Sequence, residues 1–327
     1  MIVAVADRAD PAAVARALAA RGLWVRRLDG AGAVLFAVEP HSQSVTRETL
    51  LAIEGVAAVA VEKSPHPLVD ALPARARVGA IEIGDGAPAV IMAGPCAVES
   101  EAHARESAAA LAPLGVRFLR GGAFKPRSSP YAFQGHGVRA LAWLRRAADE
   151  YGLAVVTEAL APADVPAVAE HADLVQIGSR NMQDFALLRA VGASGKPALL
   201  KRGMAATVEE WLLAAEYVVS SGSPAVVFCE RGLRTFDRWS RNLLDLGAVA
   251  LLARVRRLPV IADPSHAAGR RELVLPLARA AIAAGAHGLL VETHADPGRA
   301  LSDGPQALSA RDLAVLVEDV RKIGGVR

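Results

Sequence analysis

The sequence is poor in cysteine and in aromatic residues. Its 327 residues include two cysteines, Cys96 and Cys229, and aromatic residues make up 4% of the chain. Two cysteines exclude a framework of several disulfides. A chain that uses no disulfides fits a reducing compartment, so we predict a cytoplasmic protein.

The chain also lacks the patterns of membrane or nucleic-acid binding. We find no run of about 18 uncharged apolar residues, so no membrane span is expected. The opening "MIVAVADRADP" has no basic segment ahead of an apolar one, so no signal peptide is expected. The net charge of +3 and the absence of basic runs interleaved with aromatics argue against nucleic acid. Small anions are the better-fitting partners for its cations.

At its N-terminal end the chain is predicted to form a small front domain over residues 1–70. Strand-like segments at 1–6, 23–29, 32–40 and 56–63 alternate with helix-like segments at 10–22 and 46–55. This βαββαβ order is the ferredoxin-like motif. The stretch "PHPLVDALPARARVG" carries three prolines and is predicted to end the unit. Residues 71–87 are predicted to be a linker and barrel entry.

Residues 88–327 repeat a strand, a loop and a helix. Eight short apolar strands are expected at 89–94, 116–121, 153–159, 173–179, 197–203, 225–232, 259–265 and 288–294. Short apolar runs are typical of strands buried on both faces. Eight such units in about 240 residues predict a (β/α)8 TIM barrel. A doubly wound sheet is the competing fold, but no GxGxxG follows the first strand.

Each predicted strand ends on a polar or ionisable group, and active sites of such barrels lie at these C-terminal ends. Of the five lysines, Lys125 and Lys201 fall there. Crowded cations require anions, for which arginine provides paired hydrogen bonds and lysine a point charge. The sequence therefore predicts a phosphorylated or carboxylated substrate. The converging cations are Arg120, Lys125, Arg127, Arg180, Lys201 and Arg231.

Three residues at strand ends and Asp303, which follows the last strand in "ALSDGP", are potential metal ligands: Cys96, His266, Glu292 and Asp303. One thiolate, one imidazole and two carboxylates suit a divalent Mn, Fe, Co or Zn ion. No CxxC or HExxH spacing supports the site, so the prediction depends on the barrel placement.

The motifs in order are "AGPCAVES", "RGGAFKPRSSPYAFQG", "VVTEA", "QIGSRNMQDF", "LLKRGM", "FCERGLRTF", "ADPSHAAGRR" and "VETHADPGRALSDGPQAL". From about residue 75 to 310 the chain resembles 3-deoxy-D-arabino-heptulosonate 7-phosphate (DAHP) synthases. The closest resemblance is to the type I-beta form, which has an N-terminal ferredoxin-like regulatory domain. The resemblance implies condensation of phosphoenolpyruvate with erythrose 4-phosphate, the first step of the shikimate pathway and of aromatic amino acid biosynthesis.

The resemblance also implies roles for individual residues. It assigns the metal to Cys96, His266, Glu292 and Asp303, and the phosphate of erythrose 4-phosphate to Arg127 and Ser128. Ser128 stands where many relatives have threonine, and the hydroxyl is kept. The resemblance assigns the binding of phosphoenolpyruvate to Arg120, Lys125, Arg180, Lys201 and Arg231. Gln176 and Asp263 complete the expected substrate-binding set.

The implied chemistry uses the metal as a Lewis acid on the aldehyde oxygen. Carbon 3 of phosphoenolpyruvate attacks the aldehyde, water adds at carbon 2, and phosphate leaves by C–O cleavage. We expect Glu158 and Lys201 to position or activate that water, with His266 or a metal-bound water sharing the proton transfer. The resemblance further implies a tetramer or dimer and feedback control by tyrosine or phenylalanine through the front domain.

Three other functions remain open. Lys201 is compatible with Schiff-base chemistry, which would leave the metal quartet idle. A 3-deoxy-octulosonate 8-phosphate synthase using arabinose 5-phosphate shares the barrel, but its relatives carry a "KANRSS"-like loop where this chain has "KPRSS". A non-catalytic regulatory barrel would need a broken site.

Several polar and aromatic residues are expected to play no part in the site. Cys229 is interpreted as a small core residue. The tryptophans Trp143, Trp211 and Trp239 are predicted to pack within helices. His294 is open between the rim of the site and a bystander. The histidines expected to be solvated or packed are His103, His136, His171 and His287.

Overall fold

The computed structural model describes residues 1–30, 33–39, 43, 45–61, 63–126 and 129–324. The chain forms two compact units, Met1–Pro65 and His66–Arg327. Arg127 and Ser128, predicted to bind the sugar phosphate, lie outside the described residues. Among the described helices, none has the length and apolar composition that crossing a membrane requires.

The first unit is a four-stranded antiparallel sheet with two helices, in the order β2-β3-β1-β4. Its core joins sheet residues such as Val3 and Phe36 to helix residues such as Leu18 and Leu50, so the helices pack on the sheet. The predicted ferredoxin-like fold is confirmed. The elements are β1 (Ile2–Val5), α1 (Pro11–Ala19), β2 (Val25–Gly30), β3 (Ala33–Val38), α2 (Arg47–Leu51) and β4 (Val56–Ala60).

Local sequence explains where α1 begins. Asp10 is the N-cap, and its carboxylate accepts a hydrogen bond from the Ala12 amide at 2.9 Å. Pro11 occupies the first helical position, where its missing N–H leaves no hydrogen bond unmade. Val14 and Leu18 then fall four residues apart on the face that is buried.

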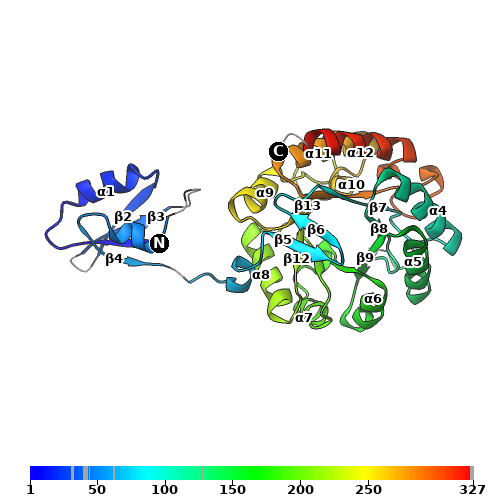
Figure 1. The fold of residues 1–327 in the computed structure, drawn as a ribbon, viewed down its shortest axis with the longest axis horizontal. Coiled ribbons are helices and arrows are strands. Elements are labelled where there is room, and N and C mark those ends of the chain that lie inside the picture. Colours follow the sequence, from blue (N-terminus) through cyan, green and yellow to red (C-terminus); the bar gives the residue numbers. More distant parts are fainter. Residues whose placement is uncertain (31–32, 40–42, 44, 62, 127–128, 325–327) are drawn as a thin grey trace. The chain divides into compact units, whose positions relative to one another are not determined.

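The second unit is a closed eight-stranded parallel barrel, which confirms the predicted TIM fold (Figure 1). Every described residue of β7, β8, β10, β11, β12, β13 and β14 is buried, as expected when side chains fill the barrel and helices cover it. The strands are β7 (Val90–Gly94), β8 (Phe118–Arg120), β9 (Ala154–Ala159), β10 (Leu174–Ile177), β11 (Ala198–Lys201), β12 (Val226–Glu230), β13 (Val260–Ala262) and β14 (Gly288–Glu292).

Helices alternate with these strands around the barrel. They are α4 (Glu101–Leu111), α5 (Val138–Tyr151), α6 (Val165–His171), α7 (Phe185–Ala193), α8 (Val208–Ser220), α9 (Leu246–Ala250), α10 (Pro264–Ala268), α11 (Arg271–Ala284) and α12 (Ala310–Gly324). Helix α9 continues into a π-helical turn at Leu251–Val255. Short 3-10 helices cover Ala112–Leu114, Pro162–Asp164, Ser179–Asn181, Pro297–Arg299 and Gly304–Gln306.

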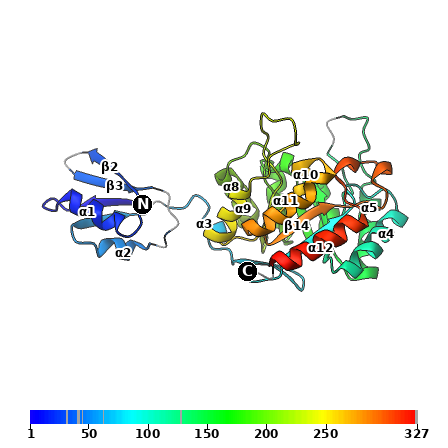
Figure 2. The same cartoon turned by 90° about the horizontal axis from the view of Figure 1, so that it is seen from above.

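The proline-bearing stretch after the first unit has regular structure. It contains α3 (Pro67–Asp70), whose Leu68 and Val69 amides donate to the Glu216 carboxylate of α8 at 3.0 and 2.8 Å. Then β5 (Arg75–Val78) and β6 (Ile81–Gly84) form a hairpin. Its apolar side chains share one buried cluster with those inside the barrel, so the hairpin closes one end of it. Figure 2 shows long loops projecting from the barrel.

One predicted packing residue lies elsewhere. Trp211 is buried in α8, and its indole donates to the Leu200 carbonyl at 3.1 Å. Trp239 instead lies between β12 and α9 and is 80% exposed. The prediction for Trp239 was therefore wrong, because the segment between those elements forms bends and turns rather than a helix.

Candidate active site

A cavity of about 410 Å³ opens at the C-terminal ends of the barrel strands. Residues that follow or end β8, β9, β10, β11, β12 and β13 all reach it. Its lining is mainly cationic: seven basic side chains face two carboxylates, Glu158 and Asp303. The basic residues are Arg120, Lys125, Arg180, Lys201, Arg231, Arg234 and Arg241.

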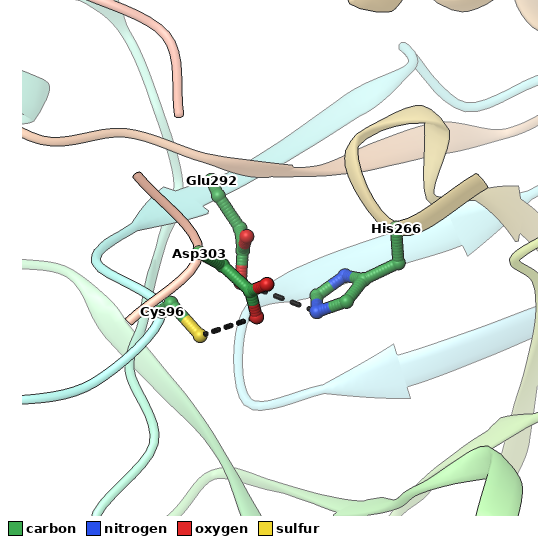
Figure 3. A group of neighbouring side chains, drawn as sticks. All are labelled: Cys96, His266, Glu292 and Asp303. Atoms are coloured by element: carbon green, nitrogen blue, oxygen red, sulfur yellow. Dashed lines mark hydrogen bonds and ion pairs between the residues drawn. The ribbon is translucent and has the colours of Figure 1, made fainter. Parts of the chain in front are cut away.

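Four side chains beside this cavity form a compact set of metal-ligand types. Cys96, His266, Glu292 and Asp303 each offer one donor atom, and these atoms lie within 4.8 Å of one another. Figure 3 shows the four side chains pointing toward a common centre. One sulfur, one imidazole nitrogen and two carboxylate oxygens fit a borderline divalent cation. The sequence placed these residues at three separate strand ends and a distant loop, and the fold brings them together.

Cys96 is the buried sulfur donor, held by polar neighbours. Its Sγ lies 2.8 Å from the Ser302 hydroxyl and donates to Asp303 Oδ2 at 3.2 Å. The Lys125 ammonium donates to the Cys96 carbonyl at 2.8 Å and to Sγ at 3.0 Å. Burial, with the charge of Glu292, raises the pKa of the thiol to about 12. The sulfur is therefore protonated at neutral pH unless a cation displaces the proton.

Asp303 is held by an unusual backbone conformation. It is one of two non-glycine residues in the described chain with positive φ, at 52°. Aspartate tolerates this left-handed region better than most residues, and such conformations concentrate at functional sites. Burial acts to raise the pKa of Asp303, but the charge of His266 and the contact with Cys96 outweigh it, so that pKa lies below its ordinary value.

Gln306 and Arg241 contact the carboxylates of Glu292 and Asp303. The Gln306 amide donates to Glu292 Oε2 at 2.9 Å, and Arg241 donates to Gln306 Oε1 at 3.1 Å. Arg241 also lies 3.4 Å from Asp303 Oδ1. Hydrogen bonds of this kind fix the orientation of metal-ligating carboxylates. Neither Gln306 nor Arg241 was predicted from the sequence, because nothing adjacent in the chain marks them.

His266 is oriented by a buried carboxylate. Its Nδ1 lies 2.7 Å from Asp263 Oδ2, which leaves Nε2 facing the other ligands, 3.2 Å from Glu292 Oε1. Asp263 is fully buried, and the Lys201 ammonium donates to it at 2.6 Å. Burial acts to raise the pKa of Asp263, but His266 and Lys201 lower it well below the ordinary value. Asp263 thus lies behind the cavity wall and joins Lys201 to His266.

Glu292 ends β14 and pairs with a buried arginine. Arg120 Nη1 donates to Glu292 Oε1 at 3.1 Å and to the Pro95 carbonyl at 2.7 Å. Burial acts to raise the pKa of Glu292, but the charges of His266 and Arg120 keep it below the ordinary value. Glu292 is therefore a carboxylate in the folded protein, as a metal ligand must be.

Two glycines make room for site side chains. A Cβ at Gly122 would lie 2.7 Å from both the Cys96 carbonyl and Lys125 Cδ, so this position must be small for Lys125 to reach Cys96. A Cβ at Gly178 would lie 1.9 Å from Glu158 Oε1, so a larger residue there would displace the carboxylate. The glycines after β8 and β10 thus set where the two side chains lie.

Three cavity arginines have no carboxylate partner. Among the described residues, Arg180, Arg231 and Arg234 form no ion pair, although Arg231 is buried and its Nη1 has no hydrogen-bond acceptor. Burial lowers the pKa of Arg231 below its ordinary value. Of the three, only Arg231 is buried, whereas Arg180 and Arg234 are exposed. A buried guanidinium group needs an anion, so Arg231 marks where an anionic ligand fits.

The predicted residues that the structure describes fall in two groups. The cavity wall contains Arg120, Lys125, Glu158, Gln176, Arg180, Lys201, Arg231, His266 and Asp303. Buried behind or beside it lie Cys96, Asp263 and Glu292. The wall also contains Met204, Arg234, Arg241 and Asn242, which were not predicted from the sequence. Of these, Arg234 carried a signal, since it is a cation three residues after Arg231 in the same loop.

A (β/α)8 barrel with a cation-lined cavity and a Cys-His-Glu-Asp cluster at its strand ends defines a site for a small anionic substrate beside a divalent cation. Residues 54–323 match the DAHP synthetase I family. A phospho-2-dehydro-3-deoxyheptonate aldolase of Thermotoga maritima is 52% identical over 246 residues, which cover 75% of this chain and 72% of that protein. The chain therefore belongs to the DAHP synthetase I family.

Two solved structures agree with this family, and a more distant relative carries the octonate name. The crystal structure of the Thermotoga maritima DAHP synthase matches 99% of this chain and 97% of that one, with a TM-score of 0.78 and 41% identity. A truncated form of that organism's enzyme matches 77% of this chain with a TM-score of 0.72. A 2-dehydro-3-deoxyphosphooctonate aldolase of Acidithiobacillus ferrooxidans is 35% identical over 249 residues, covering 71% of this chain and 88% of that protein.

Proposed function

We propose that this chain condenses phosphoenolpyruvate with erythrose 4-phosphate and water, giving 3-deoxy-D-arabino-heptulosonate 7-phosphate and phosphate. The observation that carries the proposal is the joining of a four-ligand cluster to an arginine- and lysine-lined cavity, in a chain of the DAHP synthetase I family. The higher identity to the heptonate aldolase than to the octonate aldolase, 52% against 35%, supports erythrose 4-phosphate as the sugar.

A divalent Mn, Fe, Co or Zn ion would be held by Cys96, His266, Glu292 and Asp303. The donor set fits, because Asp263 orients His266 and Gln306 orients Glu292, as outer partners of metal ligands do. When bound, such an ion supplies Lewis-acid polarisation to the aldehyde oxygen.

The cavity cations would bind phosphoenolpyruvate, which carries a phosphate and a carboxylate. Arg180 and Arg231 have no carboxylate partner within the described chain, so their guanidinium groups are available to these anions. Arg120 and Lys125, which already contact the ligand cluster, would hold the second anionic group next to it. Fixing both groups orients carbon 3 toward the aldehyde and lowers the entropic barrier to joining two substrates.

Lys201 and Glu158 would act on the water that adds at carbon 2. Both line the cavity, on the two strands β9 and β11 that flank β10. Lys201 is ion-paired to Asp263 within a cation-lined cavity, which supports an anion-binding role over Schiff-base chemistry. Glu158 would accept a proton from the water as carbon 2 becomes electrophilic, after which the C–O bond to phosphate breaks. We assign Asp263 to positioning Lys201 and His266 rather than to direct contact with substrate.

The phosphate of erythrose 4-phosphate is proposed to bind Arg127 and Ser128, which lie outside the described residues. Their neighbours Lys125 and Pro126 border the described site, and Pro126 lines the cavity. The first unit is proposed to act in feedback control by tyrosine or phenylalanine in a type I-beta enzyme, and the protein to be a cytoplasmic dimer or tetramer. Removing residues 1–65 should leave turnover and abolish inhibition, and inhibition retained in the truncated chain would contradict this role.

The substrate assignment is tested by loss of phosphoenolpyruvate ultraviolet absorbance with the purified full chain and manganese. Erythrose 4-phosphate should be consumed, and arabinose 5-phosphate should be turned over far more slowly. Preference for arabinose 5-phosphate would move the protein to the octulosonate reaction. No turnover with either sugar, in folded metal-loaded protein, would favour a regulatory barrel.

A further inference from the structure

A second cluster of metal-ligand types lies outside the site described above. Glu99 follows β7, His103 is in the first turn of α4, and His294 follows β14. One donor atom from each lies within 4.8 Å of the others. The cluster shares no residue with the Cys96 quartet. None of its three side chains was assigned a role by the predicted chemistry.

His103 has nitrogen atoms that the rest of the chain does not use. Both Nδ1 and Nε2 are buried and have no hydrogen-bond partner among the described residues. Burial, with the nearby His294, lowers the pKa of His103, so the ring is neutral at physiological pH and keeps a lone pair. A buried neutral imidazole with two unsatisfied nitrogens is costly unless a ligand fills the gap.

His294 and Glu99 face this ring. The His103 and His294 ring centroids are 4.6 Å apart, and His294 Nε2 lies 3.5 Å from Glu99 Oε1. The His294 side chain is 10% exposed and that of Glu99 19%. The Leu301 amide donates to Glu99 Oε1 at 2.8 Å and fixes the carboxylate. This backbone contact therefore holds Glu99 in place before any ligand arrives.

We propose that Glu99, His103 and His294 form a second cation site, selective for borderline divalent ions such as zinc or cobalt. Two imidazoles and one carboxylate are a common protein ligand set for these ions, with water completing the coordination. The site has no sulfur donor, which separates it chemically from the Cys96 quartet. It also does not depend on the proposed activity, since it binds no substrate group.

The hydrogen bonds of His294 give this site a distinctive signature. The Asp296 amide donates to His294 Nδ1 at 3.0 Å, so in the metal-free protein the ring proton sits on Nε2. A cation at Nε2 needs that lone pair, so the proton moves to Nδ1 and the bond to Asp296 breaks. Asp296 is exposed, and its amide can bond to water instead.

The position indicates a structural role. Glu99 is three residues from Cys96 and His294 two from Glu292, and Leu301, bonded to Glu99, is two residues from Asp303. A cation joining Glu99, His103 and His294 would tie together the segments that carry three ligands of the quartet. We expect it to stabilise these segments against unfolding without touching substrate.

The test is cobalt titration of the metal-free full chain, with bound cobalt counted after dialysis. Wild type should bind two equivalents of cobalt, and His103→Ala should bind one. The control variant His171→Ala, which removes a histidine on α6, should bind two. The sulfur-to-cobalt charge-transfer band of the Cys96 site should persist in His103→Ala. In Cys96→Ala the band should vanish while one equivalent remains. A single equivalent in wild type that carries the sulfur-to-cobalt band, or two equivalents in His103→Ala, would overturn the proposal.

A second measurement covers the case in which His103→Ala does not fold. Nitrogen-15 NMR of wild type should show His294 protonated at Nε2 without metal and at Nδ1 once a second equivalent of zinc is added. An unchanged His294 tautomer at two equivalents of zinc would overturn the proposal, whatever happens to the variant.

Discussion

The mouth of the barrel and the core of the first unit bury different kinds of side chain, charged in the first and apolar in the second. The barrel mouth buries five charged residues that are at most 4% exposed: Arg120, Lys201, Glu230, Asp263 and Glu292. In the described part of residues 1–65, no polar or charged residue is buried. Buried charges are expensive even when paired. The difference shows that the barrel carries groups that stability alone would not select, whereas the first unit has a conventional apolar core.

The buried charges are arranged in connected pairs. Lys201 contacts Asp263, which contacts His266, and Arg120 contacts Glu292. Below them, Arg202 pairs with both Glu230 and Asp245 at 3.1 and 2.8 Å. Each pair offsets part of the desolvation cost of its members, which explains how several charges remain in a site of limited size.

Among the substitutions that test this difference between the two units, Lys201→Met is expected to have the largest effect, a loss of activity. The substitution removes a cation from the cavity wall and leaves Asp263 with His266 as its remaining ionic partner. We expect kcat/KM to fall by about 10²–10³, the usual loss for one electrostatic group in an active site. Steady-state kinetics measures this, with Lys196→Met, outside the site, as the control. Equal losses in the two variants would show that the effect is not local.

Gln306→Leu tests whether the supporting hydrogen bonds matter to the ligands. The change removes the bond to Glu292 Oε2 and leaves Arg241 without its amide partner. Metal affinity should fall by about 10–100-fold. Activity should return at saturating metal, which a folding defect would not allow. An unchanged metal affinity, measured by titration, would show that Gln306 does not support the metal ligands.

In the first unit, Leu18→Ala should lower stability and leave turnover unchanged. Leu18 is fully buried in the apolar core, so its truncation should destabilise that unit by about 2–5 kcal/mol. Uninhibited turnover should be unchanged, because no described residue of this unit belongs to the barrel cavity. Denaturant unfolding and kinetics on one sample give both values. A loss of turnover comparable to that of Lys201→Met would erase the contrast between the units.

The smallest effect concerns pH and Asp245. Burial acts to raise the pKa of Asp245, but Arg202 and the Ala248 amide lower it below its ordinary value of 3.8. The carboxylate therefore stabilises the fold above that value, and the contribution disappears as pH falls through the lower folded pKa. Asp245→Asn should cost about 1 kcal/mol of unfolding free energy near neutral pH, and this cost should shrink as pH falls below 3.8 and through the lower folded pKa. A cost independent of pH would contradict this.

The sequence predicted the parts of the molecule that are marked locally. Short apolar strands ending on Cys96, Arg120, Lys201 or Glu292 showed both the barrel and the edge where the groups gather. The placement of Asp263 behind Lys201 and His266 was not predictable, because it depends on which way a side chain turns after β13. Gln306 was missed for a related reason: its partners Glu292 and Arg241 are distant in sequence, and it does not stand at a strand end.

Loop residues were also poorly predicted. Trp239 has the spacing of a helix residue but lies exposed in the segment after β12. The segment at 65–79 reads as a linker, yet its apolar residues Val69, Ala76 and Val78 are buried against the barrel. In both cases tertiary contacts, rather than local propensity, decide the conformation.

The most direct test of the account measures phosphoenolpyruvate consumption with erythrose 4-phosphate before chelation, after thorough chelation, and after manganese is returned. The same series is run on Cys96→Ala. We predict that wild type loses activity with the chelator and regains it with manganese, while the variant stays inactive throughout. Wild-type activity that survives complete removal of metal would contradict the central claim that Cys96, His266, Glu292 and Asp303 hold a catalytic cation.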